Sequence, residues 1–335
     1  MIKTEYLQII LRGYGLPEQI LKVLPLKEVE AKNERHFLYR VDLANELRLV
    51  CRISFGDSYS KELLEQQCEF SEKLRTYGLP IAKKYRLCDR EGNYVFEFQH
   101  SYVTVEQYAG TDVDRVSLDE IYQLGVLLGG MRHISECDPS QIDYAPVCSA
   151  IREGRANFNR ILARSDPALL QREDVRAARI LHDELICRLR AMLDELPHGA
   201  VHGDLGIFTN VVTADEALSI IDFNLARDEP FLYDLLSCFY SSIHKYTWRD
   251  RWKDIDRQQA LERFLRGYAS RRTLAKAERE QYCLVAALFD GLFYCKAILE
   301  EYGNTGNPLV LDHFCAATAK FDFSRHGYPL TPTVV

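Results

Sequence analysis

The sequence predicts an α+β fold with two lobes, a small N-terminal lobe built from a β-sheet and one helix and a larger, mainly helical C-terminal lobe. Three observations lead to this prediction. Runs of strand-forming residues are concentrated before residue 110, helical patterns dominate after residue 117, and a chain of 335 residues is longer than one compact core usually holds.

The N-terminal lobe is predicted from alternating strand-forming runs around one well-marked helix. The runs FLYRVDL and LRLVCRISF, separated by a three-residue turn, predict a β-hairpin. The stretch KELLEQQCEFSEKLRTYG has apolar residues at helical spacing and closes at a glycine. The expected elements are a helix at 4–13 with Thr4 as its N-cap, strands at 37–43 and 47–55, a helix at 61–78, and strands at 93–99 and 102–110.

The C-terminal lobe is predicted to be helical apart from one β-like segment. Its first helix begins with a capping box, in which Ser117 is followed three positions later by Glu120. The expected helices are 117–134, 148–164, 170–195, 231–246, 256–270 and 276–301. Only residues 201–228 among them have strand character. We therefore predict two lobes at 1–107 and 108–335, with a ligand cleft between them.

Composition limits the classes of function. A formal charge of −7 argues against a nucleic-acid groove, which needs a basic face. Ten cysteines occur without any C-x-x-C pair, so reduced thiols packed as small apolar groups are expected rather than a disulfide or metal framework. The start MIKTEYLQII has no apolar run long enough for a signal peptide, and no stretch approaches a membrane span. A cytoplasmic enzyme or binding protein, without a nucleic-acid or membrane partner, is the expectation.

The segment VHGDLGIFTNVVTADEALSIIDFNLARD, residues 201–228, carries the chemistry. Asp204 lies in a turn, Asn210 precedes one strand-like run, and Asp222 follows another. A hairpin over 211–221 would return Asp222 to the edge where Asn210 lies. Asp and Asn are also common turn residues, so each alone carries little weight. Together they fit phosphoryl transfer, with Asp204 as the base and Asn210 and Asp222 as Mg²⁺ ligands.

The ordered motif HGD-L…N-V-V…I-I-D-F resembles the signature of the aminoglycoside phosphotransferase superfamily, which includes choline kinases and type II homoserine kinases. The resemblance covers nearly the whole chain, and it implies a protein-kinase-like fold, ATP and Mg²⁺ as cofactors, and a small-molecule hydroxyl as acceptor. In relatives the Asn comes five residues after the catalytic Asp, whereas Asn210 comes six after Asp204. We interpret the extra residue as a bulge in the loop.

The resemblance also implies a nucleotide site in the N-terminal lobe. Arg52 stands where relatives have the ATP-binding lysine, and Glu69 in the helix at 61–78 would pair with it. The stretch EQYAG resembles the interlobe hinge, so the backbone of Glu106, Gln107 and Tyr108 would take the adenine. The expected phosphate-covering loop, 27–37, contains no glycine.

Two further residues are expected to support the loop. His202 precedes the Gly-Asp turn and would orient it by hydrogen bonds, and Asp234 resembles a carboxylate that supports the catalytic loop in relatives. The acceptor pocket is expected near 231–246 and 285–301, where Asp290, Glu300 and Glu301 either meet a cationic acceptor or belong to a solvated face.

Two functional interpretations stay open at this level. The first is an ATP-dependent small-molecule kinase acting on an aminoglycoside, amino alcohol, homoserine-like amino acid or sugar. The second is a catalytically silent kinase-like module that binds nucleotide or a protein, which Arg52, the shifted Asn210 and the glycine-free loop favour. The sequence does not indicate the oligomeric state. A protein kinase is disfavoured because the chain lacks D-F-G, H-R-D and A-P-E motifs.

Overall fold

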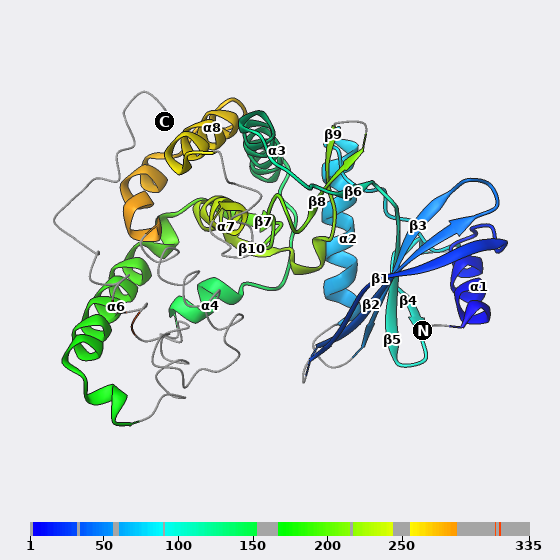
Figure 1. The fold of residues 1–335 in the computed structure, drawn as a ribbon, viewed down its shortest axis with the longest axis horizontal. Coiled ribbons are helices and arrows are strands. Elements are labelled where there is room, and N and C mark those ends of the chain that lie inside the picture. Colours follow the sequence, from blue (N-terminus) through cyan, green and yellow to red (C-terminus); the bar gives the residue numbers. More distant parts are fainter. Residues whose placement is uncertain are drawn as a thin grey trace. The chain divides into compact units, whose positions relative to one another are not determined.

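The structure is a computed structural model that describes residues 3–31, 34–55, 60–89, 91–152, 167–214, 217–243, 255–286, 312 and 315. The chain divides into two compact units (Figure 1). The first comprises residues 1–112, 140–143 and 211–226, and the second comprises residues 113–139, 144–210 and 227–335. The predicted boundary at 107 falls five residues from the end of the first segment, but the hairpin of 211–226 groups with the N-terminal sheet rather than with the helices.

The first unit is organised around a five-stranded antiparallel sheet of order β1-β2-β3-β5-β4 (Figure 1). Its strands are β1 (Ile20–Ala31), β2 (Glu34–Leu43), β3 (Arg48–Phe55), β4 (Phe96–Phe98) and β5 (Ser101–Gln107). The hairpin of β2 and β3 is confirmed, whereas β1 was not predicted because its lysines, glutamates and proline obscure any alternation of apolar residues. The segment 27–37, expected as a phosphate-covering loop, forms the facing ends of β1 and β2, and residues 32–33 lie outside the described part.

Helix α1 (Thr4–Gly13) packs its apolar side against this sheet. The helix is where the sequence predicts it, but its N-cap is Lys3 rather than Thr4, and no side chain caps it. The hydrophobic core between α1 and the sheet combines three residues of the helix with alternating residues of the strands. Its fully or almost fully buried members include Leu7, Ile10, Leu11, Val41, Leu49, Ile53, Val103 and Val105. Burial of such side chains contributes about 1.5–3 kcal/mol each, so this cluster holds the sheet in place.

Helix α2 (Lys61–Thr76) begins at Ser60, whose hydroxyl accepts a hydrogen bond from the Leu63 amide at 3.1 Å. The chain then runs through residues 79–82 alongside a small second sheet. That sheet contains β6 (Thr111–Asp112), β8 (Val211–Ala214) and β9 (Ala217–Ile220), with Val211 paired to Ile220. The predicted hairpin over 211–221 is therefore confirmed. Ile220 donates to Pro80 at 2.8 Å and accepts from Ala82 at 3.2 Å, which joins the hairpin to the segment after α2.

The second unit is mainly helical (Figure 1). Its helices are α3 (Leu118–Cys137), α4 (Pro146–Arg152), α6 (Glu173–Met192), α7 (Phe231–Ile243), α8 (Arg257–Ala269) and the helical residues 276–286, with two short strands, β7 (His198–Val201) and β10 (Arg227–Pro230). The predicted capping box of Ser117 and Glu120 is present. Residues 153–164, 244–246 and 287–301 of three predicted helices lie outside the described part of the chain, as do Asp290, Glu300 and Glu301. No helix that the structure describes is long and apolar enough to cross a membrane.

Helices α3 and α8 pack at unusually close range through glycines. A Cβ added to Gly125 would lie 2.1 Å from the Phe264 carbonyl oxygen, and one added to Gly267 would lie 2.1 Å from the Tyr122 carbonyl oxygen. Because the neighbouring atoms belong to backbone, a side chain at either position must push the helices apart. These glycines are therefore required by packing rather than by backbone conformation.

We expect Gly125→Ala to lower the free energy of unfolding by roughly 1–3 kcal/mol, the usual cost of overpacking, even though alanine favours an isolated helix. Urea unfolding followed by circular dichroism measures this. Gln123→Ala, on the exposed side of the same helix, should change the unfolding free energy by less than about 0.5 kcal/mol. Equal stability of the Gly125 variant and the parent protein would contradict the assignment of close packing.

Candidate active site

The loop that carries Asp204 directly follows strand β7 and is held in place by buried side chains of the second unit. Arg132, which is fully buried, donates to the Ala200 carbonyl at 2.9 Å and forms an ion pair with Asp234. The second carboxylate oxygen of Asp234 accepts the Gly203 amide at 2.9 Å. Asp234 therefore links an arginine of α3 to the backbone next to Asp204, which is consistent with the supporting position predicted for it.

The side chain of His202 is fully buried beside this turn, and its Nδ1 accepts the Asp204 amide at 3.4 Å. Gly203 has a φ of +82°, which a residue with a side chain adopts only at a cost. Helix α7 supports the following residues, since Ser241 donates to the Leu205 carbonyl at 2.9 Å and Ser242 accepts the Ile207 amide at 3.0 Å. The backbone on both sides of Asp204 is fixed, while its side chain is partly exposed.

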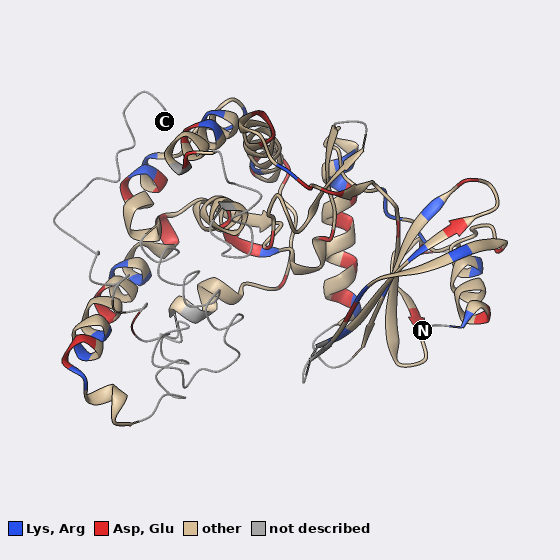
Figure 2. Cartoon of the chain, viewed as in Figure 1, with Lys and Arg blue, Asp and Glu red and all other residues tan. Residues whose placement is uncertain are grey.

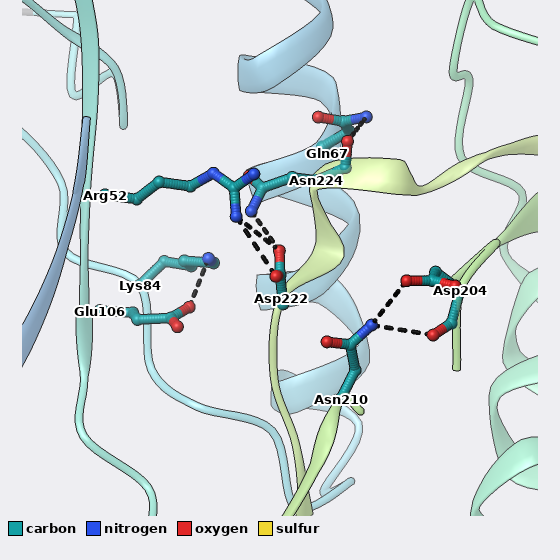
Figure 3. Close-up of polar contacts among 8 residues, drawn as sticks. All are labelled: Arg52, Gln67, Lys84, Glu106, Asp204, Asn210, Asp222 and Asn224. Atoms are coloured by element: carbon teal, nitrogen blue, oxygen red, sulfur yellow. Dashed lines mark hydrogen bonds and ion pairs between the residues drawn. The ribbon is translucent and has the colours of Figure 1, made fainter. Parts of the chain in front are cut away.

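Asn210 turns back onto Asp204 (Figure 3). Its side-chain nitrogen donates to the Asp204 carbonyl at 2.8 Å and to the Asp204 carboxylate at 3.3 Å. A single helical turn makes this possible, because the Gly206 carbonyl accepts the amides of both Thr209 and Asn210. The extra residue of the loop is absorbed in that turn. Asn210, rather than Thr209, is the residue that meets Asp204.

In the first unit, Asp222 follows strand β9 in a left-handed conformation, with φ 58° and ψ 65°. Such a backbone costs about 1–3 kcal/mol in a residue other than glycine, and residues of this kind are concentrated at functional sites. Its carboxylate accepts hydrogen bonds from Arg52 Nη1 at 3.0 and 3.2 Å and from the Asn224 side-chain amide (Figure 3). Arg52 and Asp222, which are 170 positions apart in sequence, thus form a direct ion pair.

The pairing predicted for Glu69 is not formed. Acidic residues recur along α2 (Figure 2), but Glu69 is exposed and makes no hydrogen bond or ion pair with Arg52 in the part of the chain that the structure describes. The reason is the helix face, because the buried side of α2 carries Leu64, Gln67, Ser71 and Leu74, and Glu69 points away from it. Gln67 is the buried polar residue, and it donates to the carbonyls of Asn224 and Ala226 at 2.9 and 3.0 Å.

A second buried ion pair lies beside Arg52 and was not predicted. Lys84 Nζ donates to Glu106 Oε2 at 2.5 Å, and the two side chains are only 4% and 13% exposed (Figure 3). Glu106 was expected to contribute through its backbone, whereas here its carboxylate binds a lysine. Burial acts to lower the pKa of Lys84, but the charge and hydrogen bond of Glu106, with smaller contributions from Cys68 and Asp222, outweigh it, so the pKa is raised.

Part of the backbone of the segment expected to bind adenine already forms hydrogen bonds with other parts of the protein. The Gln107 amide donates to the Lys83 carbonyl at 2.8 Å, and the Tyr108 amide donates to the Arg48 carbonyl at 2.9 Å. These bonds continue the sheet beyond β5. They leave the amides of Gln107 and Tyr108 committed to the protein, so a base would have to use other backbone groups of this segment.

Three residues of these clusters were not predicted from the sequence, namely Lys84, Arg132 and Asn224. Arg132 lies within the predicted helix 117–134, and an arginine in a largely apolar helix stretch is a signal that it is paired. Asn224 lies two residues after Asp222, within the quoted segment. Lys84 carries no local signal. No cluster of three or more His, Cys, Asp or Glu side chains suited to a metal occurs among the residues that the structure describes.

Comparison with known families identifies the chain. A family model described as "Phosphotransferase enzyme family" matches residues 27–279, which is well over half of the sequence. The chain belongs to the phosphotransferase enzyme family. The resemblance inferred from the HGD, Asn and IDF motifs is thereby confirmed, and so is the expectation of a phosphotransferase. A search of curated proteins gave no match.

Solved structures agree on the fold of this phosphotransferase. The amicoumacin kinase hAmiN, solved in complex with AMP-PNP, Ca²⁺ and Ami, superposes with a TM-score of 0.64 at 15% identity over 93% of this chain and 92% of that one. A microcompartment-associated aminopropanol kinase gives 0.61 at 16% identity over 95% and 94% of the two chains. The choline kinase LicA from Streptococcus pneumoniae gives 0.54 at 17% over 95% and 100%. The predicted protein-kinase-like α+β fold is therefore confirmed.

For this phosphotransferase, we expect Asp234→Ala to lower the free energy of unfolding by about 3–5 kcal/mol, because it leaves the buried Arg132 guanidinium without its counter-charge. Chemical denaturation provides the measurement. The control is Asp183→Ala, whose carboxylate lies 3.8 Å from Arg179 on an exposed surface, and it should cost at most about 1 kcal/mol. Similar losses in the two variants would show that the clamp on the Asp204 loop contributes little.

Proposed function

We propose that this protein is an ATP- and Mg²⁺-dependent kinase that transfers a phosphoryl group to a hydroxyl of a small molecule. The observation that supports the proposal most is the Asp204–Asn210 contact on a loop whose backbone is held from three sides. The proposal takes Asp222 together with this pair because Asn210 is bonded to Val211, and Val211 pairs with Ile220 two residues before Asp222. Phosphoryl transfer requires this kind of positioning and little covalent chemistry from the protein.

In this proposal Asp204 accepts the proton of the attacking hydroxyl. Its carboxylate is partly exposed, and Asn210 donates to only one of its oxygens, Oδ2, so Oδ1 is available to the acceptor. The hydroxyl oxygen would then form the new bond to the γ-phosphorus as its proton passes to Asp204, and the bond from that phosphorus to the β–γ bridging oxygen would break, so that ADP leaves. His202 and Asp234 act by positioning the backbone of the loop and do not touch the reacting atoms.

The residues present suit a magnesium ion. The Asn210 amide oxygen takes no part in the bonds to Asp204, and Asp222 offers a carboxylate, so both supply the hard oxygen ligands that Mg²⁺ prefers. When bound, Mg²⁺ neutralises charge on the phosphate chain. Arg52 would bind phosphate oxygens, and its Nε is buried with no hydrogen-bond partner among the described residues, so part of its donor capacity is unused.

The base of the nucleotide is proposed to bind along residues 106–110. The amides of Gln107 and Tyr108 already donate hydrogen bonds within the protein, so the base would bind to the remaining carbonyls and amides of this segment. The side chain of Glu106 would not contact the base, because it is bonded to Lys84. Use of ATP places the enzyme in the cytoplasm in this proposal.

Small amino alcohols are the first acceptors to examine. The aminopropanol kinase and the choline kinase among the structural neighbours act on molecules that carry both a hydroxyl and a nitrogen. Release of ADP in a panel of aminopropanol, choline, homoserine, amino sugars and aminoglycosides is the direct screen. The aminoglycoside kinases among the neighbours justify including the last class.

Asp204→Asn tests the proposed reaction. We expect turnover with the best acceptor to fall by about 10²–10⁴-fold, the usual contribution of a general base, while affinity for Mg²⁺·ATP changes less than about threefold. Coupled ADP release and calorimetry give the two quantities. Asp183→Asn, on the exposed side of α6, is the matched control and should retain full turnover. Undiminished turnover of the Asp204 variant would refute its role as the base.

A catalytically silent module is the second candidate, and the Arg52–Asp222 ion pair favours it because each group would satisfy the other without a ligand. The two proposals predict different calorimetric results. A kinase binds ATP only weakly without Mg²⁺ and binds it well with Mg²⁺, whereas a silent module shows no metal-dependent ATP binding at millimolar nucleotide.

A further inference from the structure

Lys84 is a buried lysine, and its burial carries a free-energy cost. Its backbone amide donates to Glu72 Oε1 at 2.7 Å, and its ammonium group donates to Glu106 at 2.5 Å. Removing both members of an ion pair from water costs several kcal/mol per ion, and apolar residues of similar volume are often as stable. A buried Lys–Glu pair therefore indicates a role other than packing.

Lys84 faces the same small cavity as Arg52 and Asp222 (Figure 3). The polar groups that line it are Arg52, Lys84, Thr104, Glu106, Asp222 and Asn224, and all of them belong to the first unit. Its volume is about 10 Å³, roughly the space of a single water molecule. Two cations and two carboxylates thus converge on one point and neutralise each other in pairs.

The two cations differ in how their donors are used. Arg52 spends Nη1 on Asp222, the carboxylate proposed to bind metal. Lys84 donates one N–H to Glu106, and an ammonium group has three. The ammonium group of a lysine is charged at neutral pH. Lys84 can therefore bind an anion without leaving the carboxylate that orients it.

We propose that Lys84 is a second phosphate-binding cation of the nucleotide site and that Glu106 is its positioning residue. This inference rests on the proposed kinase function. The ion pair of a cation and a glutamate that the sequence predicted for Arg52 and Glu69 is supplied instead by Lys84 and Glu106, from the segment after α2 and from β5. The anion is a nucleotide polyphosphate, of which this cavity has room for about one oxygen, because the cavity is lined by the proposed metal ligand Asp222 and the cation Arg52.

The alternative is that Lys84 serves only as the counter-ion of Glu106. The double variant Lys84→Met/Glu106→Gln separates these roles, since it removes both charges together and leaves no unpaired buried ion. We expect it to unfold cooperatively, to bind Mg²⁺·ATP and Mg²⁺·ADP about 10- to 100-fold more weakly than the parent protein, and to bind adenosine within about twofold. Isothermal titration calorimetry at constant ionic strength measures all three ligands.

Lys83→Met is the matched control, because Lys83 is the neighbouring lysine and is exposed. It should leave ATP affinity within about twofold. Should the double variant not fold, Lys84→Gln replaces it, since glutamine can still donate a hydrogen bond to Glu106 while lacking the charge. The same loss for ATP and the same indifference to adenosine are expected.

Three outcomes would overturn the inference. Unchanged ATP affinity in a folded Lys84 variant would show that the lysine only balances Glu106. Equal losses for ATP and adenosine would show an effect on the fold of the site rather than on phosphate. Absence of Mg²⁺·ATP binding by the parent protein would refute the proposed kinase function, and this inference with it, whereas binding by the parent protein and by the variant alike refutes the inference alone.

Discussion

The backbone hydrogen bonds between Ile220 and the segment after α2 fix the position of the β8–β9 hairpin. The ion pair of Arg52 and Asp222 in the first unit depends on that position. Ile220 donates to Pro80 and accepts from Ala82, so the β8–β9 hairpin becomes part of the unit that contains the N-terminal sheet, although 140 positions separate Pro80 from Ile220. Asp222 follows two residues later in a left-handed conformation and meets Arg52 from the sheet. Without these two backbone bonds, neither the strained backbone of Asp222 nor its ion pair would be held in place.

The loop that carries Asp204, in the second unit, depends instead on a buried ion pair. Arg132 and Asp234 are both within a few per cent of complete burial, and between them they bond the backbone at Ala200 and Gly203. Breaking such a pair is costly, so the loop has one conformation rather than many. Rigidity in this loop is useful because a base must lie within hydrogen-bond reach of the proton that it removes. The buried pair of Arg132 and Asp234 is thus directed to the backbone around Asp204.

Local patterns revealed most of the elements and the residues of the Asp204–Asp222 segment, because helix periodicity, caps and turn residues depend on neighbours in sequence. Side-chain partners across the fold could not be predicted in this way. The error on Glu69 was avoidable, since the buried stripe of Leu64, Ser71 and Leu74 already places position 69 on the opposite face of α2. The burial of Lys84 could not have been predicted. The adjacent residues Lys83 and Lys84 lie in an extended segment and point to opposite sides, and only the packing of β5 and α2 decides which one is buried.

The Arg52–Asp222 pair has a thermodynamic consequence under the proposed function. A metal that binds Asp222 competes with Arg52 for the same carboxylate, and a phosphate that binds Arg52 competes with Asp222 for the same guanidinium. Each ligand therefore removes an interaction that opposes the other, so the affinities of metal and polyphosphate rise together and by the same factor. Lys84 does not take part in this competition because its counter-ion is Glu106. Under the proposed function, phosphate would therefore meet Lys84 without displacing the ion pair at Asp222, whereas Nη1 of Arg52 would be released when a metal takes over Asp222.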